Sequence, residues 1–155
     1  MIDISYKGDT IVLVNSDKKE ISFHPETHEV LLEGFDVNYP GEYEKAGILL
    51  EVKEFASKLF YHFVVEGNHL VVIPNEGFEA KEEILSFFGD VDILLINGSK
   101  ESAKLFESIE AKIAIPFGEG KDIFLNTLGQ HVDESSSYKV KADLPIDNTE
   151  FVNLV

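Results

Sequence analysis

The chain has 155 residues, of which 44% are hydrophobic and 11% aromatic, a composition that excludes a disordered chain and suits one folded domain over residues 1–155. Its 13 basic residues are all lysine and face 29 acidic residues, so the net charge of −16 argues against binding to nucleic acid or to an anionic membrane. Because the sequence has no cysteine, disulfide bonds, thiolate nucleophiles and cysteine-based metal sites are excluded as well.

No apolar run approaches the roughly 20 residues that a transmembrane helix needs, and the first residues lack the basic and apolar regions of a signal peptide. We therefore expect a cytoplasmic protein. The simplest explanation of the acidity is solubility, and an acidic face for a basic partner is the alternative.

The first half of the sequence predicts short strands joined by turns, in an antiparallel meander. Ile2 and Ile4 alternate with polar residues, as in a strand with one buried face. Gly8, Asn15 and Pro40-Gly41 lie in segments whose composition favours turns. The further strands expected in this half are residues 10–14, 19–23, 30–32 and 46–52.

The second half predicts a hairpin followed by alternating helices and strands. The hairpin joins residues 59–65 and 69–74 through Glu66-Gly67-Asn68. Helices are expected where apolar residues recur at helical spacing, with Gly89 and Ser99 as caps, and strands where apolar residues are continuous. These elements are a helix at residues 79–88, a strand at 91–96, a helix at 100–109, a strand at 111–116 and a helix at 122–128.

The tail of the sequence predicts a loop at residues 133–137 and then a last pair of strands, residues 138–142 and 151–155. An antiparallel first half followed by a β-α-β-α second half is typical of sheets that are covered by helices. The fold class we predict is therefore an α/β sandwich of mixed sheets flanked by helices.

Two histidines stand four residues apart in His24-Pro25-Glu26-Thr27-His28, a spacing that is found in zinc-protease helices. Pro25 biases His24 toward an extended backbone, so the two imidazoles need not share a face. Ordinary surface histidines are the simpler interpretation, and a metal site is the alternative. The remaining histidines are isolated in the sequence, and we expect them to be structural or solvated: His62, His69 and His131.

Two further motifs resemble reactive loops only in part. Asn97-Gly98-Ser99 stands at a strand-to-helix turn, where some hydrolases place a nucleophilic serine, but Glu101 replaces the second glycine of that motif. We therefore expect Ser99 to cap the following helix. Gly118-Glu119-Gly120-Lys121 lacks the spacing of a phosphate-binding loop and is interpreted as a turn.

Four blocks of the sequence occur in the order seen in the small metallo-β-lactamase-like hydrolases, and the chain resembles that family over most of its length. The most specific block is the Pro-Gly-Glu-Tyr-Glu segment at residues 40–44, and the stretch around Asp143-Leu144-Pro145 also resembles the family's final strands. The four blocks are residues 1–9, 39–48, 89–96 and 111–116. The resemblance implies a metallo-β-lactamase-like fold of reduced size.

The resemblance also implies where metal ligands would stand, and other residues occupy those places. The family's His-x-His-x-Asp-His loop would lie between Pro25 and Tyr39, an interval too short to contain it. The positions of a ligating histidine and of the bridging aspartate fall on Val72 and Asn75, and that of the final histidine falls on Gly118. The resemblance therefore implies a degenerate member without the metal ligands, and we expect no cofactor.

Three functions are compatible with this sequence. The first is a non-catalytic binding or assembly module. The second is a metal-dependent hydrolase whose site is completed by another subunit or rebuilt from His24, His28, Glu76 and Glu119. The third is a small-molecule site at the strand ends, for which the candidate residues are Asn75, Glu76, Asn97, Gly98, Ser99, Gly118 and Glu119.

The shortened interval also predicts a homodimer, because it should leave apolar surface uncovered. Phe35, Val37 and Tyr39 lie in that interval, and the strand at residues 59–65 has large apolar side chains on both faces. We expect a two-fold dimer with one of these regions at its interface. The alternative is that the helices at residues 79–88 and 100–109 cover the strand within one chain.

Overall fold

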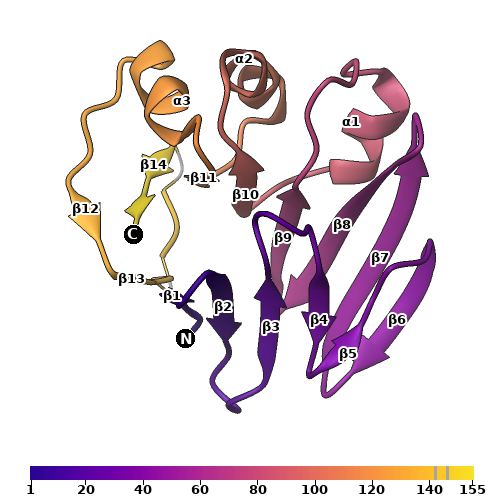
Figure 1. The fold of residues 1–155 in the computed structure, drawn as a ribbon. Helices are drawn as coiled ribbons and strands as arrows, with labels where there is room; N and C mark the ends of the chain where they lie inside the picture. The colour runs from indigo at the N-terminus through magenta and orange to yellow at the C-terminus, as the bar shows by residue number, and fades with distance from the viewer. Residues whose placement is uncertain (142, 146) are drawn as a thin grey trace.

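The computed structural model describes residues 1–141, 143–145 and 147–155 and has three layers (Figure 1). A six-stranded sheet packs against a seven-stranded sheet, and three helices cover the outer face of the seven-stranded sheet. This is an α/β fold with mixed sheets and flanking helices, which confirms the predicted class, although all three helices lie against one sheet. No helix in the described residues is long and apolar enough to cross a membrane.

The first sheet is an antiparallel meander with one strand added from the tail. Its strand order is β13-β1-β2-β3-β4-β5, and every neighbouring pair is antiparallel. Alternation is clear in β4, where Val30 and Leu32 are buried and Leu31 is not. The strands are β1 (Asp3–Lys7), β2 (Thr10–Val14), β3 (Glu20–Phe23), β4 (Val30–Leu32), β5 (Phe35–Asp36) and β13 (Ser137–Lys139).

The second sheet is antiparallel at one end and parallel at the other. Its order is β14-β11-β10-β9-β8-β7-β6, with antiparallel pairs from β6 to β9 and parallel pairs from β9 to β14. Both faces of β10 and β11 are covered, which explains their continuous apolar sequences. The strands are β6 (Gly41–Lys45), β7 (Ile48–Phe55), β8 (Lys58–Val65), β9 (Asn68–Ile73), β10 (Ile93–Asn97), β11 (Ile113–Phe117) and β14 (Glu150–Phe151).

The three helices lie close to their predicted places. α2 (Lys100–Ile109) has the predicted bounds, and α3 (Lys121–Thr127) begins and ends one residue early. α1 (Glu82–Phe88) begins three residues later than expected. The preceding segment stays non-helical, and its Phe78 ring packs edge-on against Phe60 with centroids 4.9 Å apart.

The strand β8 is covered on both faces within one chain. Tyr61 and Phe63 pack in the core between the sheets, and Phe60 packs in the core beneath the helices. The expectation that this strand leaves a bare apolar patch was therefore wrong, because the hairpin lies inside the sandwich. In the shortened interval, Val37 is buried in the core, so its predicted exposure was wrong. Phe35 and Tyr39 are 53% and 72% exposed, which leaves them as the available surface for the predicted dimer.

The tail contributes edge strands to three different sheets, so the predicted pairing of residues 138–142 with 151–155 was wrong. Tyr138 in β13 pairs with Ile4 of β1, and β14 pairs with β11. β15 (Asn153–Leu154) pairs with β12 (Glu134–Ser135), a short strand within the predicted loop. Apolar patterning indicates a strand but does not predict its partner: β13 and β14 extend the edges of the two large sheets, whereas β12 and β15 form a small sheet of their own. Ala142 and Ile146, which fall within the predicted tail, lie outside the described residues.

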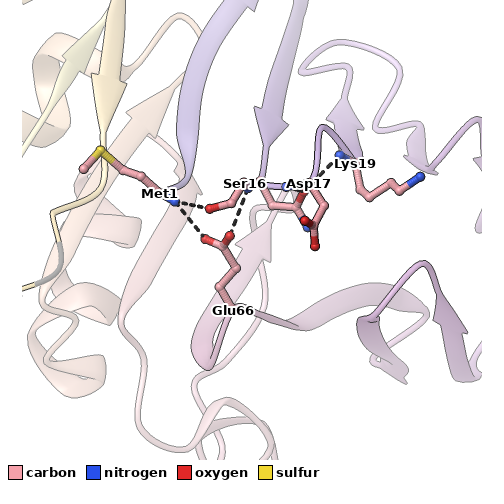
Figure 2. Close-up of polar contacts among 6 residues, drawn as sticks. Met1, Ser16, Asp17, Lys19 and Glu66 are labelled. Atoms are coloured by element: carbon pink, nitrogen blue, oxygen red, sulfur yellow. Dashed lines mark hydrogen bonds and ion pairs between the residues drawn. The ribbon is translucent and has the colours of Figure 1, made fainter.

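A polar cluster joins the two sheets between the turn from β2 to β3 and the turn from β8 to β9. Figure 2 shows Glu66, in the turn between β8 and β9, accepting a hydrogen bond from the Ser16 backbone N–H at 2.9 Å. The same carboxylate lies 3.4 Å from the amino group of Met1, which also donates to the Ser16 hydroxyl. The hydrogen bonds from Ser16 lower the pKa of Glu66, so its carboxylate stays ionised beside the amino group of Met1.

Candidate functional site

A wide cleft lies where β10 and β11 end, between the loops that follow them. Its volume is about 1140 Å³, and we call it the strand-end cleft. Ligands of α/β folds gather at such carboxyl ends. The cleft is lined by six of the seven predicted small-molecule residues: Glu76, Asn97, Gly98, Ser99, Gly118 and Glu119. Asn75, the seventh, lines two neighbouring cavities instead.

The glycines of this cleft are required by the packing of two loops. A Cβ atom on Gly98 would lie 2.6 Å from the carbonyl oxygen of Gly120, and one on Gly120 would lie 2.0 Å from that of Gly98. The Gly98 N–H also donates to the carbonyl of Phe117 at 2.8 Å. Gly118 has φ of +86°, and its Cβ would lie 2.8 Å from Asn97 Oδ1. The close approach of the two backbones therefore explains why these positions are glycine, without any role in ligand binding.

The two asparagines at the strand ends fasten neighbouring backbone. Asn97 Nδ2 donates to the carbonyl of Pro74 at 3.1 Å, and Asn75 Nδ2 donates to the carbonyl of Leu59 at 2.7 Å. Both amides thus hold the segment that follows β9 against its neighbours. An amide oxygen is a weak neutral ligand, and neither residue supplies the negative charge or the imidazole that zinc prefers.

Ser99 caps α2, as predicted. Its hydroxyl accepts a hydrogen bond from the Ser102 N–H at 3.0 Å, and the Ser102 hydroxyl accepts one from the Ser99 N–H at 2.8 Å. This reciprocal pair satisfies two N–H groups at the start of the helix. Among the described residues no histidine is hydrogen-bonded to Ser99, so this serine has no general base to activate it.

The residues proposed for a rebuilt metal site are dispersed. The His24 Nδ1 atom accepts from the Thr27 N–H at 3.3 Å, inside the turn between β3 and β4. His28 lines a different cavity from Glu119, which faces the strand-end cleft. Within the described residues no three His, Asp or Glu side chains form a group that could hold a metal ion. Because zinc needs at least three protein donors, these residues do not fit zinc within one chain.

The strand-end cleft carries more negative than positive charge. Four carboxylates line it, and Lys100 is the basic residue among its lining groups. The carboxylates come from two turns of the first sheet and from the loops after β9 and β11: Asp9, Glu26, Glu76 and Glu119. The arrangement can hydrogen-bond a polar ligand and favours a neutral or cationic one.

A second cavity, of about 440 Å³, lies beside the turn between β3 and β4, and we call it the Tyr61 cavity. His28, Asp36, Lys58 and Asn75 also line it. Burial raises the pKa of Tyr61 to about 12 and lowers the pKa of His28. Sequence reasoning missed Tyr61, because its neighbours on the same face of β8 are apolar and only the hydroxyl distinguishes it.

Sequence reasoning also missed a pair of histidines on the outer face of the second sheet. His62 Nε2 lies 2.9 Å from His69 Nδ1, and His62 Nδ1 donates to the carbonyl of Phe87 at 3.1 Å. Hence neutral His62 accepts the hydrogen bond from His69. Neither residue is isolated in space, although seven positions separate them in the sequence. The hairpin prediction was the available signal, because it places both residues on adjacent strands.

Comparison with known proteins supports the fold rather than an activity. No protein-family model and no curated protein matches the chain. A crystal structure from Thermotoga maritima, described as a candidate Zn-dependent hydrolase of the metallo-beta-lactamase superfamily, is similar over 98% of each chain, with a TM-score of 0.75 and 18% sequence identity. The whole chain therefore has the fold of that protein.

Proposed function

We propose that this protein is a non-catalytic binding module with a metallo-β-lactamase-like fold, and that it binds a small polar molecule in the strand-end cleft. One observation carries the proposal. The fold is complete over the whole chain, whereas the strand ends present Asn75, Asn97 and Gly118 in hydrogen bonds and close packing. The donor set for a catalytic metal is not assembled in the described residues.

The location and chemistry of the cleft support binding. Five turns and loops converge on it, and α2 begins there, where the first N–H groups that the Ser99–Ser102 pair does not satisfy need partners from outside the helix. Its polar groups are held by hydrogen bonds and close packing at Asn97 and Gly98, so little conformational freedom would be lost when a ligand binds.

A screen of small polar metabolites by thermal shift tests this proposal. We expect a ligand whose binding becomes at least about tenfold weaker in Ile123→Trp, since a large ring at this cleft residue would obstruct the site. Leu49→Trp is the matched control, because Leu49 and Ile123 are exposed to nearly the same extent, 47% and 49%, and Leu49 lies away from the cleft. Ligands that bind both variants equally would contradict a site in the cleft.

The alternative is a metal-dependent hydrolase with an incomplete site, and the description of the similar Thermotoga maritima protein favours it. In that case a second subunit would supply the ligands that His24 and His28 lack within one chain. Added zinc or manganese would then produce phosphodiesterase or lactonase activity, and both His24→Ala and His28→Ala would abolish it. We expect no turnover with either metal.

A further inference from the structure

We propose that the Tyr61 cavity is a second ligand site, separate from the strand-end cleft, and that it binds a small zwitterion of the amino-acid type. The cavity lies between the two sheets at the end where the turn from β3 to β4 faces the start of β8. Its volume of about 440 Å³ is within the range of small-molecule sites. Apolar side chains form part of its wall: Val30, Val37, Leu59 and Pro74.

Tyr61 directs a polar group into this cavity. Its side chain is only 3% exposed, and its hydroxyl forms no hydrogen bond with another described residue. The one fully buried side-chain atom without a partner in the described residues is Asn153 Oδ1, so the Tyr61 hydroxyl must reach the cavity space. With its pKa raised to about 12, the hydroxyl stays protonated and can both donate and accept a hydrogen bond.

The charges of the cavity are divided between two places. The carboxylate of Asp36 acts on Tyr61, and the ammonium of Lys58 acts on His28. Among the described residues neither Asp36 nor Lys58 forms an ion pair. A ligand with an ammonium at Asp36 and a carboxylate at Lys58 would satisfy both charges, whereas a simple cation or anion would meet one of them unfavourably.

Further carboxylates surround this division. Glu29 lines the cavity and, like Asp36, is exposed, and the charge of Glu76 opposes and exceeds that of Lys58 at His28, so the ligand's carboxylate must lie on the Lys58 side, away from Glu76. Burial lowers the pKa of His28, so its imidazole is neutral at pH 7 and can hydrogen-bond a carboxylate.

Two hydrogen bonds to backbone carbonyls hold the walls of the cavity. The Val37 N–H donates to the carbonyl of Val30 at 2.9 Å, which joins two of its walls. Asn75 Nδ2 donates to the carbonyl of Leu59 at 2.7 Å, which joins the end of β9 to β8. The site is therefore formed before a ligand arrives, and binding need not order a loop.

Isothermal titration with each of the twenty L-amino acids tests the proposal. We expect at least one to bind with a Kd below about 1 mM, and we expect its decarboxylated amine and its deaminated acid each to bind at least about tenfold more weakly. The proposal is overturned if no amino acid binds at about 10 mM, or if either analogue binds as well as the amino acid.

Substitutions place the ligand. Tyr61→Phe keeps the ring and removes only the hydroxyl, so the domain should stay folded while affinity falls about five- to twentyfold, the effect of one lost hydrogen bond. Lys58→Gln should weaken binding further. The matched control is Tyr138→Phe, since that hydroxyl is bonded to Glu150 away from the cavity. Binding that survives Tyr61→Phe and Lys58→Gln but is lost in Ile123→Trp would contradict the inference and assign the ligand to the strand-end cleft.

Discussion

The outer face of the second sheet consists of two regions that the chain covers differently. Over β8, β9, β10 and β11, the helices bury residues such as Phe60, Val71 and Leu94 completely. Over β6 and β7 the cover is partial: α1 contacts Phe55 at the end of β7, whereas Leu49 near its start, on the same face as Phe60, is 47% exposed. Parallel strands need long crossover connections, and these contain α1, α2 and α3. The tight turns that join β6, β7 and β8 contain no helix that could cover the sheet. Connectivity therefore decides which part of the sheet is a core and which is a surface.

The largest contrast should appear on truncating one residue in each region. Phe60 is fully buried and touches the rings of Phe55, Phe78 and Phe88, with centroids 4.9–5.9 Å apart. Phe60→Ala should lower the free energy of unfolding by about 3–5 kcal/mol, whereas Leu49→Ala should lower it by less than about 1 kcal/mol. Urea denaturation measures both, and similar losses would contradict the distinction between the regions.

A substitution in the covered region should test the close approach of the two loops. A Cβ on Gly120 would lie 2.0 Å from the carbonyl oxygen of Gly98, so Gly120→Ala should cost about 1–3 kcal/mol by forcing the backbones apart. Gly8→Ala is the comparison, because no atom lies within 4 Å of its Cβ position and it measures the cost of a positive φ alone, about 1 kcal/mol. The glycine packing would be refuted if Gly120→Ala unfolded no more easily than Gly8→Ala.

The helix cap in the covered region should contribute less. Ser99→Ala removes the acceptor for the Ser102 N–H and should destabilise the domain by about 1 kcal/mol. Ser99→Asp should retain the cap and most of the stability, because aspartate accepts the same hydrogen bond. Thermal unfolding distinguishes the two variants, and equal losses in both would contradict the capping role.

The stability of the domain should depend on pH through His62, which lies on β8 at the boundary between the two regions. Burial lowers the pKa of His62 below its ordinary 6.5, and the charge of His69 adds to that effect, while the Phe87 carbonyl and Glu51 oppose it. Lys53 lies over the Phe87 ring, and Asp92 accepts from the His69 N–H. Below pH 6.5 the unfolded chain then binds more protons than the folded one, so stability present above that pH is lost as pH falls.

His62→Gln should reduce this acid sensitivity, because it removes the imidazole whose pKa burial lowers. His28 contributes in the same direction, because burial also lowers its pKa, so part of the sensitivity should remain in His62→Gln. Unfolding midpoints measured between pH 7 and pH 5 provide the comparison. An identical pH dependence in His62→Gln and the native protein would contradict a neutral His62.

The smallest effect we expect is weak dimerisation of the protein through the exposed edge at β5 and β6. Phe35 and Tyr39 are exposed at the edge formed by β5 and β6, and we propose a two-fold dimer there. Because the chain carries a net charge of −16, salt should favour the dimer. Light scattering should show a higher mass at high salt, and less of it in Phe35→Ser. A monomer mass at high salt and high concentration would exclude the dimer.

The local signals in the sequence predicted elements better than they predicted partners. α2 has its predicted bounds because Ser99 and a regular apolar stripe mark it, while α1 begins late because Phe78 is used for packing. The strands of the tail were recognised as strands, but their pairing depends on which sheet edges are open. The strand-end residues could be predicted because they follow apolar runs. Tyr61 could not, since it lies in an apolar run and only the tertiary structure places it at a cavity.

The central claim is that this domain has the fold without a site for a catalytic metal, and metal analysis of the intact protein tests it most directly. Protein purified without chelator, exposed to zinc, iron and manganese and then desalted, should retain well under about 0.2 equivalents of any of them, because no three donors converge. About one equivalent of tightly held metal per chain, lost in His24→Ala or His28→Ala, would contradict the account.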